Sequence, residues 1–162
     1  MDGWEHIEID CYVRAGTRPE PVNELVARLR NLAGTGTVAE LTVHSWPSTV
    51  DLDTDVNDRY LDIYEQLDQW AASHDAQIQP PFSVRHIDSS ITGETRRELV
   101  MPVLCLALST SRELTGVFPH TVAGDTYAPH DVVDTLEAGD ALDTLSHAIR
   151  PHHTTRTPKP LP

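Results

Sequence analysis

The sequence contains very little positive charge. Its 162 residues include 12 lysine and arginine residues against 25 aspartate and glutamate residues, which gives a formal net charge of −13. Lys159 is the only lysine, and the basic residues concentrate only at Arg96 and Arg97 and in the proline-rich segment 150–160. Nucleic-acid-binding proteins usually present basic patches to phosphates. The composition therefore leaves nucleic-acid binding open without favouring it.

Other absences exclude further classes of protein. Cys11 and Cys105 are the only cysteines and form no C-x-x-C, so neither a disulfide framework nor a zinc site is indicated. No apolar run approaches the roughly 20 residues of a spanning helix, and no leader is present, so we expect a cytoplasmic protein without membrane contact. The sequence also lacks phosphate-loop, dinucleotide and G-x-S-x-G motifs. It therefore predicts no cofactor and names no reaction.

The scarcity of lysine with an excess of acidic residues resembles proteins of salt-loving archaea. The resemblance implies that the acidic surface is a solvation device. At the ionic strength of such a cytoplasm the Debye length is about 3 Å or less, so the charges repel one another little. In dilute buffer the same charge is expected to destabilise the fold.

The first half of the chain predicts a β-α-β unit. Residues 5–14 alternate between apolar and polar side chains, which indicates a strand. Residues 22–36 then show helical spacing with a glycine stop, and residues 38–46 alternate again. Residues 54–76 form the longest predicted helix, and residues 82–88 are read as a short strand. This order favours a parallel strand pair with a right-handed crossover.

The second half predicts a β-hairpin and a closing helix. Residues 89–98 are read as a polar link, VLCLALS (103–109) as a buried strand, LTGVF (114–118) as its hairpin partner, and HDVVDTLEAG (130–139) as a helix. Pro102 lies at the start of the most apolar run of the chain. Proline has no amide hydrogen to donate within a sheet, so its position there requires an explanation. We expect one domain over residues 1–149 and a disordered tail over 150–162.

The order of these elements resembles the thioredoxin-like fold. The resemblance is closest in MPVLCLALSTSRELTGVF followed by HDVVDTLEAG. It implies an α/β, β-α-β-α-β-β-α three-layer sandwich with an inserted segment before the final hairpin, and a cis Met101-Pro102 bond. Thr17 to Glu20 stand where C-x-x-C would be, so the resemblance implies no dithiol chemistry. It also implies a partner-binding groove bordered by Thr17, Arg18, Met101 and Pro102.

A second resemblance covers more of the chain. The S-x-I-T-G-E segment followed by L-x-x-P-V, seen here from Ser89 to Val103, is similar to a group of short haloarchaeal proteins that carry a helix-turn-helix label. A helix-turn-helix needs two adjacent helices, whereas the two long predicted helices are separated by a strand. Within this segment an anion-binding loop is one interpretation, through Ser89, Ser90, Thr92 and Gly93. A turn whose side chains bond its own backbone is the other.

Three functions follow from these patterns. The first is a non-enzymatic, redox-inactive thioredoxin-like binding or regulatory module of a halophilic archaeon, with a protein partner or a second copy of itself as ligand. The second is a DNA-associated transcriptional regulator. The third is an enzyme with a metal or anion site lined by some of the nine histidines, although these lack metal-ligand spacing.

Overall fold

A four-stranded sheet forms the centre of the molecule. The computed structural model describes residues 6–16, 19–53, 58–79, 82–142 and 145. The sheet has the order β2-β1-β7-β8 and consists of β1 (Glu8–Arg14), β2 (Glu40–Trp46), β7 (Leu104–Thr110) and β8 (Glu113–Phe118). β1 and β2 are parallel, whereas β7 is antiparallel to both β1 and β8. The predicted parallel pair and the predicted hairpin are therefore both confirmed.

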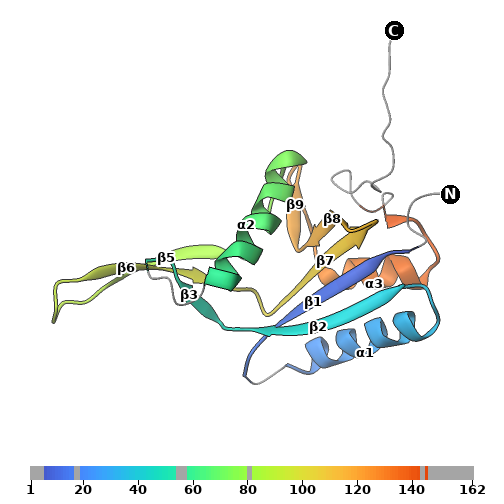
Figure 1. Cartoon of the computed structure of the whole chain (residues 1–162), viewed down its shortest axis with the longest axis horizontal. Coiled ribbons are helices and arrows are strands. Elements are labelled where there is room, and N and C mark those ends of the chain that lie inside the picture. Colours follow the sequence, from blue (N-terminus) through green and yellow to red (C-terminus); the bar gives the residue numbers. More distant parts are fainter. Residues whose placement is uncertain (1–5, 17–18, 54–57, 80–81, 143–144, 146–162) are drawn as a thin grey trace, which may run out of the picture.

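Helices cover both faces of this sheet. α1 (Glu20–Gly34) and α3 (Pro129–Glu137) pack on one face, and α2 (Asp58–Ser73) packs on the other (Figure 1). Successive residues of β7 alternate between two buried clusters: Leu106 joins the cluster of α1 and α3, and Cys105 joins the cluster of α2. Both thiols are buried. The predicted α/β class is confirmed, because each face of a strand-rich core is covered by helix.

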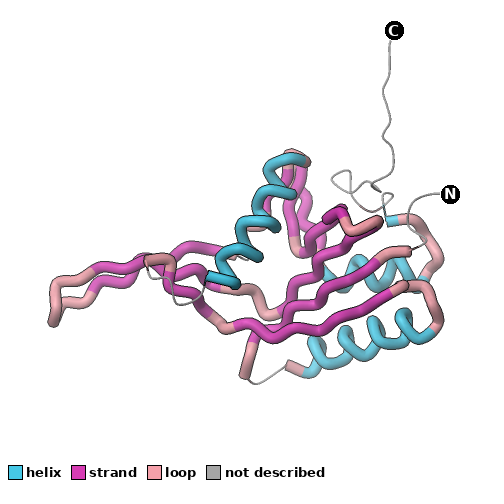
Figure 2. The backbone as a smooth tube through the Cα atoms, viewed as in Figure 1, coloured by secondary structure: helices cyan, strands magenta, loops and turns pink. Residues whose placement is uncertain are grey.

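Two smaller sheets complete the described structure (Figure 2). One has the order β3-β6-β5, from β3 (Thr49–Asp51), β5 (Ser83–Asp88) and β6 (Thr95–Val100). The other has the order β10-β9-β4, from β4 (Ala76–Gln77), β9 (His120–Val122) and β10 (Asp125–Tyr127). The interpretation of residues 89–98 as a link was wrong for the last four residues, because Thr95 to Glu98 belong to β6.

The expectation of a cis Met101-Pro102 bond was wrong. The cis bond among the described residues joins Phe118 to Pro119. The amide of Met101 still donates to the carbonyl of Ser48 at 2.9 Å, as an extension of the small sheet, and β7 begins only at Leu104. Pro102 thus stands in the passage between two sheets, where a missing amide costs no ladder hydrogen bond. The predicted tail, residues 150–162, lies outside the described residues.

Candidate nucleic-acid interface

A two-stranded arm projects from the body of the protein. We call residues 83–100 the arm; it consists of β5, β6 and the loop that joins them. β5 and β6 pair antiparallel over all six positions, from Ser83 opposite Val100 to Asp88 opposite Thr95. β3 pairs only with the inner half of β6, from Glu98 to Val100. The outer half is therefore a free ribbon, which extends well beyond the helices and the central sheet (Figure 1).

The base of the arm is anchored in the core. Leu99 lies opposite both Val50 and Val84, and the side chains of Leu99 and Val50 are fully buried in the cluster of α2. The amide of Leu52 also donates to the carbonyl of Arg97 at 2.9 Å. Burial on this scale stabilises a side chain by about 1.5–3 kcal/mol for each large aliphatic group. The ribbon is thus held in a defined direction relative to the body.

One face of the arm carries two arginines that share a carboxylate. Arg85 donates to Glu98 Oε1 at 2.7 Å and Arg96 donates to Glu98 Oε2 at 3.2 Å. The hydrogen bond from Arg85, followed by that from Arg96, holds the pKa of Glu98 below its ordinary value. The Glu98 side chain is only 13% exposed, whereas those of Arg85 and Arg96 are 56% and 54% exposed. Glu98 therefore orients two guanidinium groups that still face solvent.

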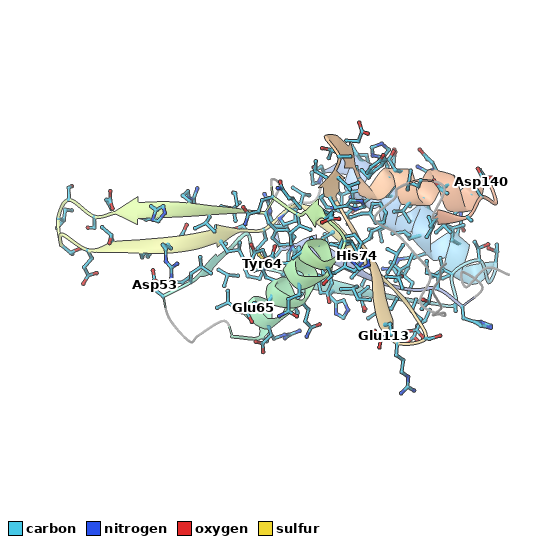
Figure 3. The ribbon with its side chains drawn as sticks, turned by 90° about the horizontal axis from the view of Figure 1, so that it is seen from above. Asp53, Tyr64, Glu65, His74, Glu113 and Asp140 are labelled. Atoms are coloured by element: carbon cyan, nitrogen blue, oxygen red, sulfur yellow. The ribbon has the colours of Figure 1, made fainter. Side chains whose placement is uncertain are left out.

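A third arginine lies on the opposite face of the ribbon. The backbone amide of Arg97 donates to Asp53 Oδ2 at 2.7 Å, and its guanidinium Nη2 donates to Oδ1 at 2.9 Å. These contacts, led by the backbone hydrogen bond, hold the pKa of Asp53 below its ordinary value. Asp53 lies beside the arm in Figure 3, and the Arg97 side chain remains 52% exposed. His86 is the cross-strand neighbour of Arg97 on the same face.

The loop at the tip of the arm closes on itself through hydrogen bonds. Gly93 N donates to Ser89 O at 2.8 Å, and Ser89 N donates to Glu94 O at 2.8 Å. Thr92 N also donates to the Ser89 hydroxyl at 3.2 Å, and Gly93 has a φ of +74°, which favours glycine. These amides are engaged within the loop, an arrangement typical of a turn. The anion-binding interpretation of Ser89, Ser90, Thr92 and Gly93 stays a prediction.

The predicted partner groove is only partly represented by the described residues. Thr17 and Arg18 lie outside them, and Met101 is fully buried, with its carbonyl accepting a hydrogen bond from the Arg14 guanidinium. Pro102 does line an apolar groove of about 370 Å³, together with Val22, Leu25 and Leu104 and with residues at the start of α3. The Pro102 carbonyl points to the core instead, where it accepts from the Trp46 indole at 3.1 Å.

The histidines are dispersed over several elements. Asp10 and His44 lie on neighbouring strands and approach to 2.8 Å. His120 is fully buried, and its Nδ1 donates to the carbonyl of Val117 at 2.6 Å. Within the described part of the chain, no group of three or more histidine, cysteine, aspartate or glutamate residues is placed to hold a metal ion. No helix described here is long and apolar enough to cross a membrane.

Sequence reasoning identified residues 82–88 as a strand and the loop after them as a candidate anion site, but it did not identify β6 or the contacts between arginines and carboxylates. Gly93 is a turn residue and indicates a hairpin between the two six-residue segments 83–88 and 95–100. Arginine, histidine and aspartate occur within these segments, so they lack the alternation of apolar and polar residues that marks a half-buried strand. Across the described ranges, strands separate each helix from the next along the chain. Adjacent helices joined by a short turn are therefore not found in this part of the molecule.

Comparisons with known proteins point to a family nonetheless. A family model described as a helix-turn-helix domain matches residues 2–141. No curated protein sequence matches the chain, and no solved structure does. Since the family model spans most of the 162 residues, the chain belongs to the helix-turn-helix domain family.

Proposed function

We propose that the protein is a DNA-associated regulatory protein that contacts duplex DNA with the arm. Among the three functions that the sequence leaves open, the family match supports this one. The described helices do not form a tandem pair, so the element we assign to the DNA is the β5–β6 ribbon. The major groove admits either an α-helix or a two-stranded β-ribbon. Ribbon readers of this kind are a known class of DNA-binding protein.

Charge supports the choice of the arm. Residues 83–100 contain three arginines and three carboxylates, so the arm has no net charge in a chain of −13. DNA phosphates repel an acidic body, and the repulsion falls off over the Debye length of about 3–10 Å at ionic strengths of 1–0.1 M. The free outer half of the ribbon has three residues per strand, or about 10 Å, and the loop adds to this length. At molar salt, where the Debye length is about 3 Å, the ribbon therefore allows contact with DNA at its tip while most of the acidic surface stays several Debye lengths away.

The proposal rests on the hydrogen bonding and the solvent exposure of Arg85, Arg96 and Arg97. Each is hydrogen-bonded to a carboxylate, yet each side chain is more than half exposed. Arginine has five N–H donors, so a guanidinium held by one carboxylate keeps donors for a phosphate or for the N7 and O6 atoms of guanine. Because Glu98 and Asp53 already restrict these side chains, less conformational entropy is lost when DNA binds.

The body of the protein is, in this proposal, a thioredoxin-like scaffold without redox chemistry. The parallel β-α-β unit, the β7–β8 hairpin and the closing helix α3 support that arrangement, whereas the trans Met101-Pro102 bond removes one argument for it. The scaffold's role is to hold the arm in place through Leu99 and Val50. The partner-groove function has less support, since Met101 is buried in the core.

The proposal is tested by measuring the binding of a fluorescent duplex over a potassium chloride series. Replacing Arg85, Arg96 and Arg97 together with glutamine should weaken binding. It should also reduce the slope of log K against log [salt] by about 0.9 for each phosphate that the variant no longer neutralises. Arg30→Gln is the control for loss of one positive charge outside the arm, because Arg30 is exposed on α1, and α1 lies away from the arm in Figure 1. An unchanged slope in the triple variant, with a native circular dichroism spectrum, would contradict the proposal.

A further inference from the structure

The tip of the arm exposes a large apolar side chain. Ile91 is 94% exposed, far more than Val84, the other large apolar side chain that is exposed among the described residues, at 43%. Val84 belongs to the base of the arm and faces Leu99 across the strand pair. The tip therefore presents one isolated isoleucine to solvent. We propose that Ile91 is a wedge that inserts between stacked base pairs of duplex DNA; this inference rests on the proposed function of the arm.

The loop is built to hold Ile91 in place. Hydrogen bonds from Ser89 N to Glu94 O and from Gly93 N to Ser89 O close the loop on either side of the isoleucine. A further bond joins Glu94 N to the Thr92 hydroxyl at 3.3 Å. A side chain on a closed turn loses less conformational freedom on insertion than one on an open loop. The closed loop thus keeps the Ile91 side chain exposed to solvent and prevents it from folding back on the arm.

The order of residues along the arm places an arginine behind the isoleucine. The last strand pair is Asp88 with Thr95, and Ile91 lies in the closed loop beyond that pair. Arg96 lies in the next pair back, opposite Ile87. When the tip approaches a duplex, Ile91 therefore arrives first, and the guanidinium of Arg96 follows on the side of the body, where it can meet a phosphate.

The chemistry of the tip favours DNA over an apolar protein surface. A protein interface would require a contiguous apolar patch, whereas Ile91 stands alone among Ser89, Ser90, Thr92 and Gly93. The hydroxyl groups of this loop suit contacts with sugar and phosphate oxygens. Proteins that bind the minor groove insert apolar side chains, isoleucine among them, between base steps and kink the duplex by about 20–90°, and β-ribbons are known to enter either groove. One isoleucine at the end of a narrow ribbon matches that requirement.

Two carboxylates next to the tip allow a test of whether the tip approaches DNA phosphates. Asp88 is the last residue of β5 and Glu94 is the last loop residue before β6, so both lie between Ile91 and the arginines along the chain. Once the wedge is inserted, both carboxylates come close to the phosphates and oppose binding. The double variant Asp88→Asn and Glu94→Gln is therefore expected to bind a duplex at least several-fold more tightly than the wild type. The gain should shrink as the salt concentration rises.

The decisive experiment compares Ile91→Ser with Ile91→Leu on a duplex that carries 2-aminopurine at a central step and a fluorophore pair at its ends. Wild type and Ile91→Leu should raise the 2-aminopurine fluorescence and bring the ends closer, and Ile91→Ser should lose both signals. Ile91→Ser should keep the salt slope of the wild type, since the arginines are unchanged. Arg30→Gln, which lies outside the arm, is the control and should bend DNA as the wild type does.

The outcomes separate this inference from the proposed function. Binding by Ile91→Ser with unchanged bending and base unstacking would overturn the wedge and leave the arm's role in DNA binding intact. Absence of binding by the wild type at every salt concentration would overturn both. If Ile91→Ser instead abolishes self-association of the wild type, measured by light scattering without DNA, the isoleucine is a protein contact and the wedge is refuted.

Discussion

Two buried tryptophans allow the energy of one hydrogen bond to be isolated. The Trp46 indole donates to the carbonyl of Pro102 at 3.1 Å. The Trp70 indole N–H is also buried, but it has no hydrogen-bond partner among the described residues. Both side chains are at most 5% exposed, and each packs against two other rings. The substitutions Trp46→Phe and Trp70→Phe therefore remove the same atoms from similar surroundings and differ in the hydrogen bond.

The expected difference can be estimated from the two sites. Both substitutions lose the packing of the larger ring, which we take as equal. Trp46→Phe additionally leaves the Pro102 carbonyl buried without this donor, at a cost of about 1–3 kcal/mol. Trp70→Phe removes a buried donor that lacks a partner, which offsets part of its packing loss. The free energy of unfolding should therefore fall by at least about 1–3 kcal/mol more for Trp46→Phe than for Trp70→Phe.

The assay is urea unfolding in molar potassium chloride. Circular dichroism is the appropriate signal, because both substitutions alter tryptophan fluorescence. The two variants should show the same m value and different midpoints, so that the difference reports stability rather than a change in the unfolded state. Equal midpoints, or a lower midpoint for Trp70→Phe, would refute the reasoning that the Trp46–Pro102 bond stabilises the passage between the sheets.

Three further predictions concern protons, salt and thiols. Burial lowers the pKa of His120, an effect that its hydrogen bond to Val117 partly opposes. Its stabilising contribution is complete above the unfolded pKa of about 6.5 and declines as the pH falls toward the folded pKa, by at most about 1.4 kcal/mol per pH unit. The stability of His120→Gln should depend less steeply on pH in that range, and identical slopes would contradict this. With a net charge of −13, the melting temperature should fall as potassium chloride is removed, and an unchanged value in dilute buffer would show that the acidic surface is no adaptation to salt. Burial raises the pKa of the Cys105 thiol, so Cys105 and Cys11 should react with a disulfide reagent only after unfolding, and insulin reduction should be absent. Turnover that disappears on Cys11→Ser would be the contrary result.

The central layers of the protein could be predicted from the sequence. The strand β1 alternates because Ile9, Cys11 and Val13 face one buried cluster while Tyr12 faces the other side of the sheet. Helix α3 and the β7–β8 hairpin were likewise predicted near their observed bounds. These elements are buried on at least one face. A buried face requires apolar residues at the period of the strand or helix, and this period can be recognised in the sequence. The α/β class, the parallel pair and the acidic charge follow from the chain alone.

The rest was decided by tertiary structure. β4, β9 and β10 have two or three residues each, too few to show a period. The outer arm is exposed on both faces, so its strands carry no apolar alternation, and only the register of β5 against β6 brings Arg85 and Arg96 to the same carboxylate of Glu98. Asp53 meets Arg97 across 44 positions of the chain. The exposure of Ile91 likewise depends on how far the ribbon extends beyond the core. Contacts at the base of the ribbon set this extension, so the sequence around Ile91 does not encode it.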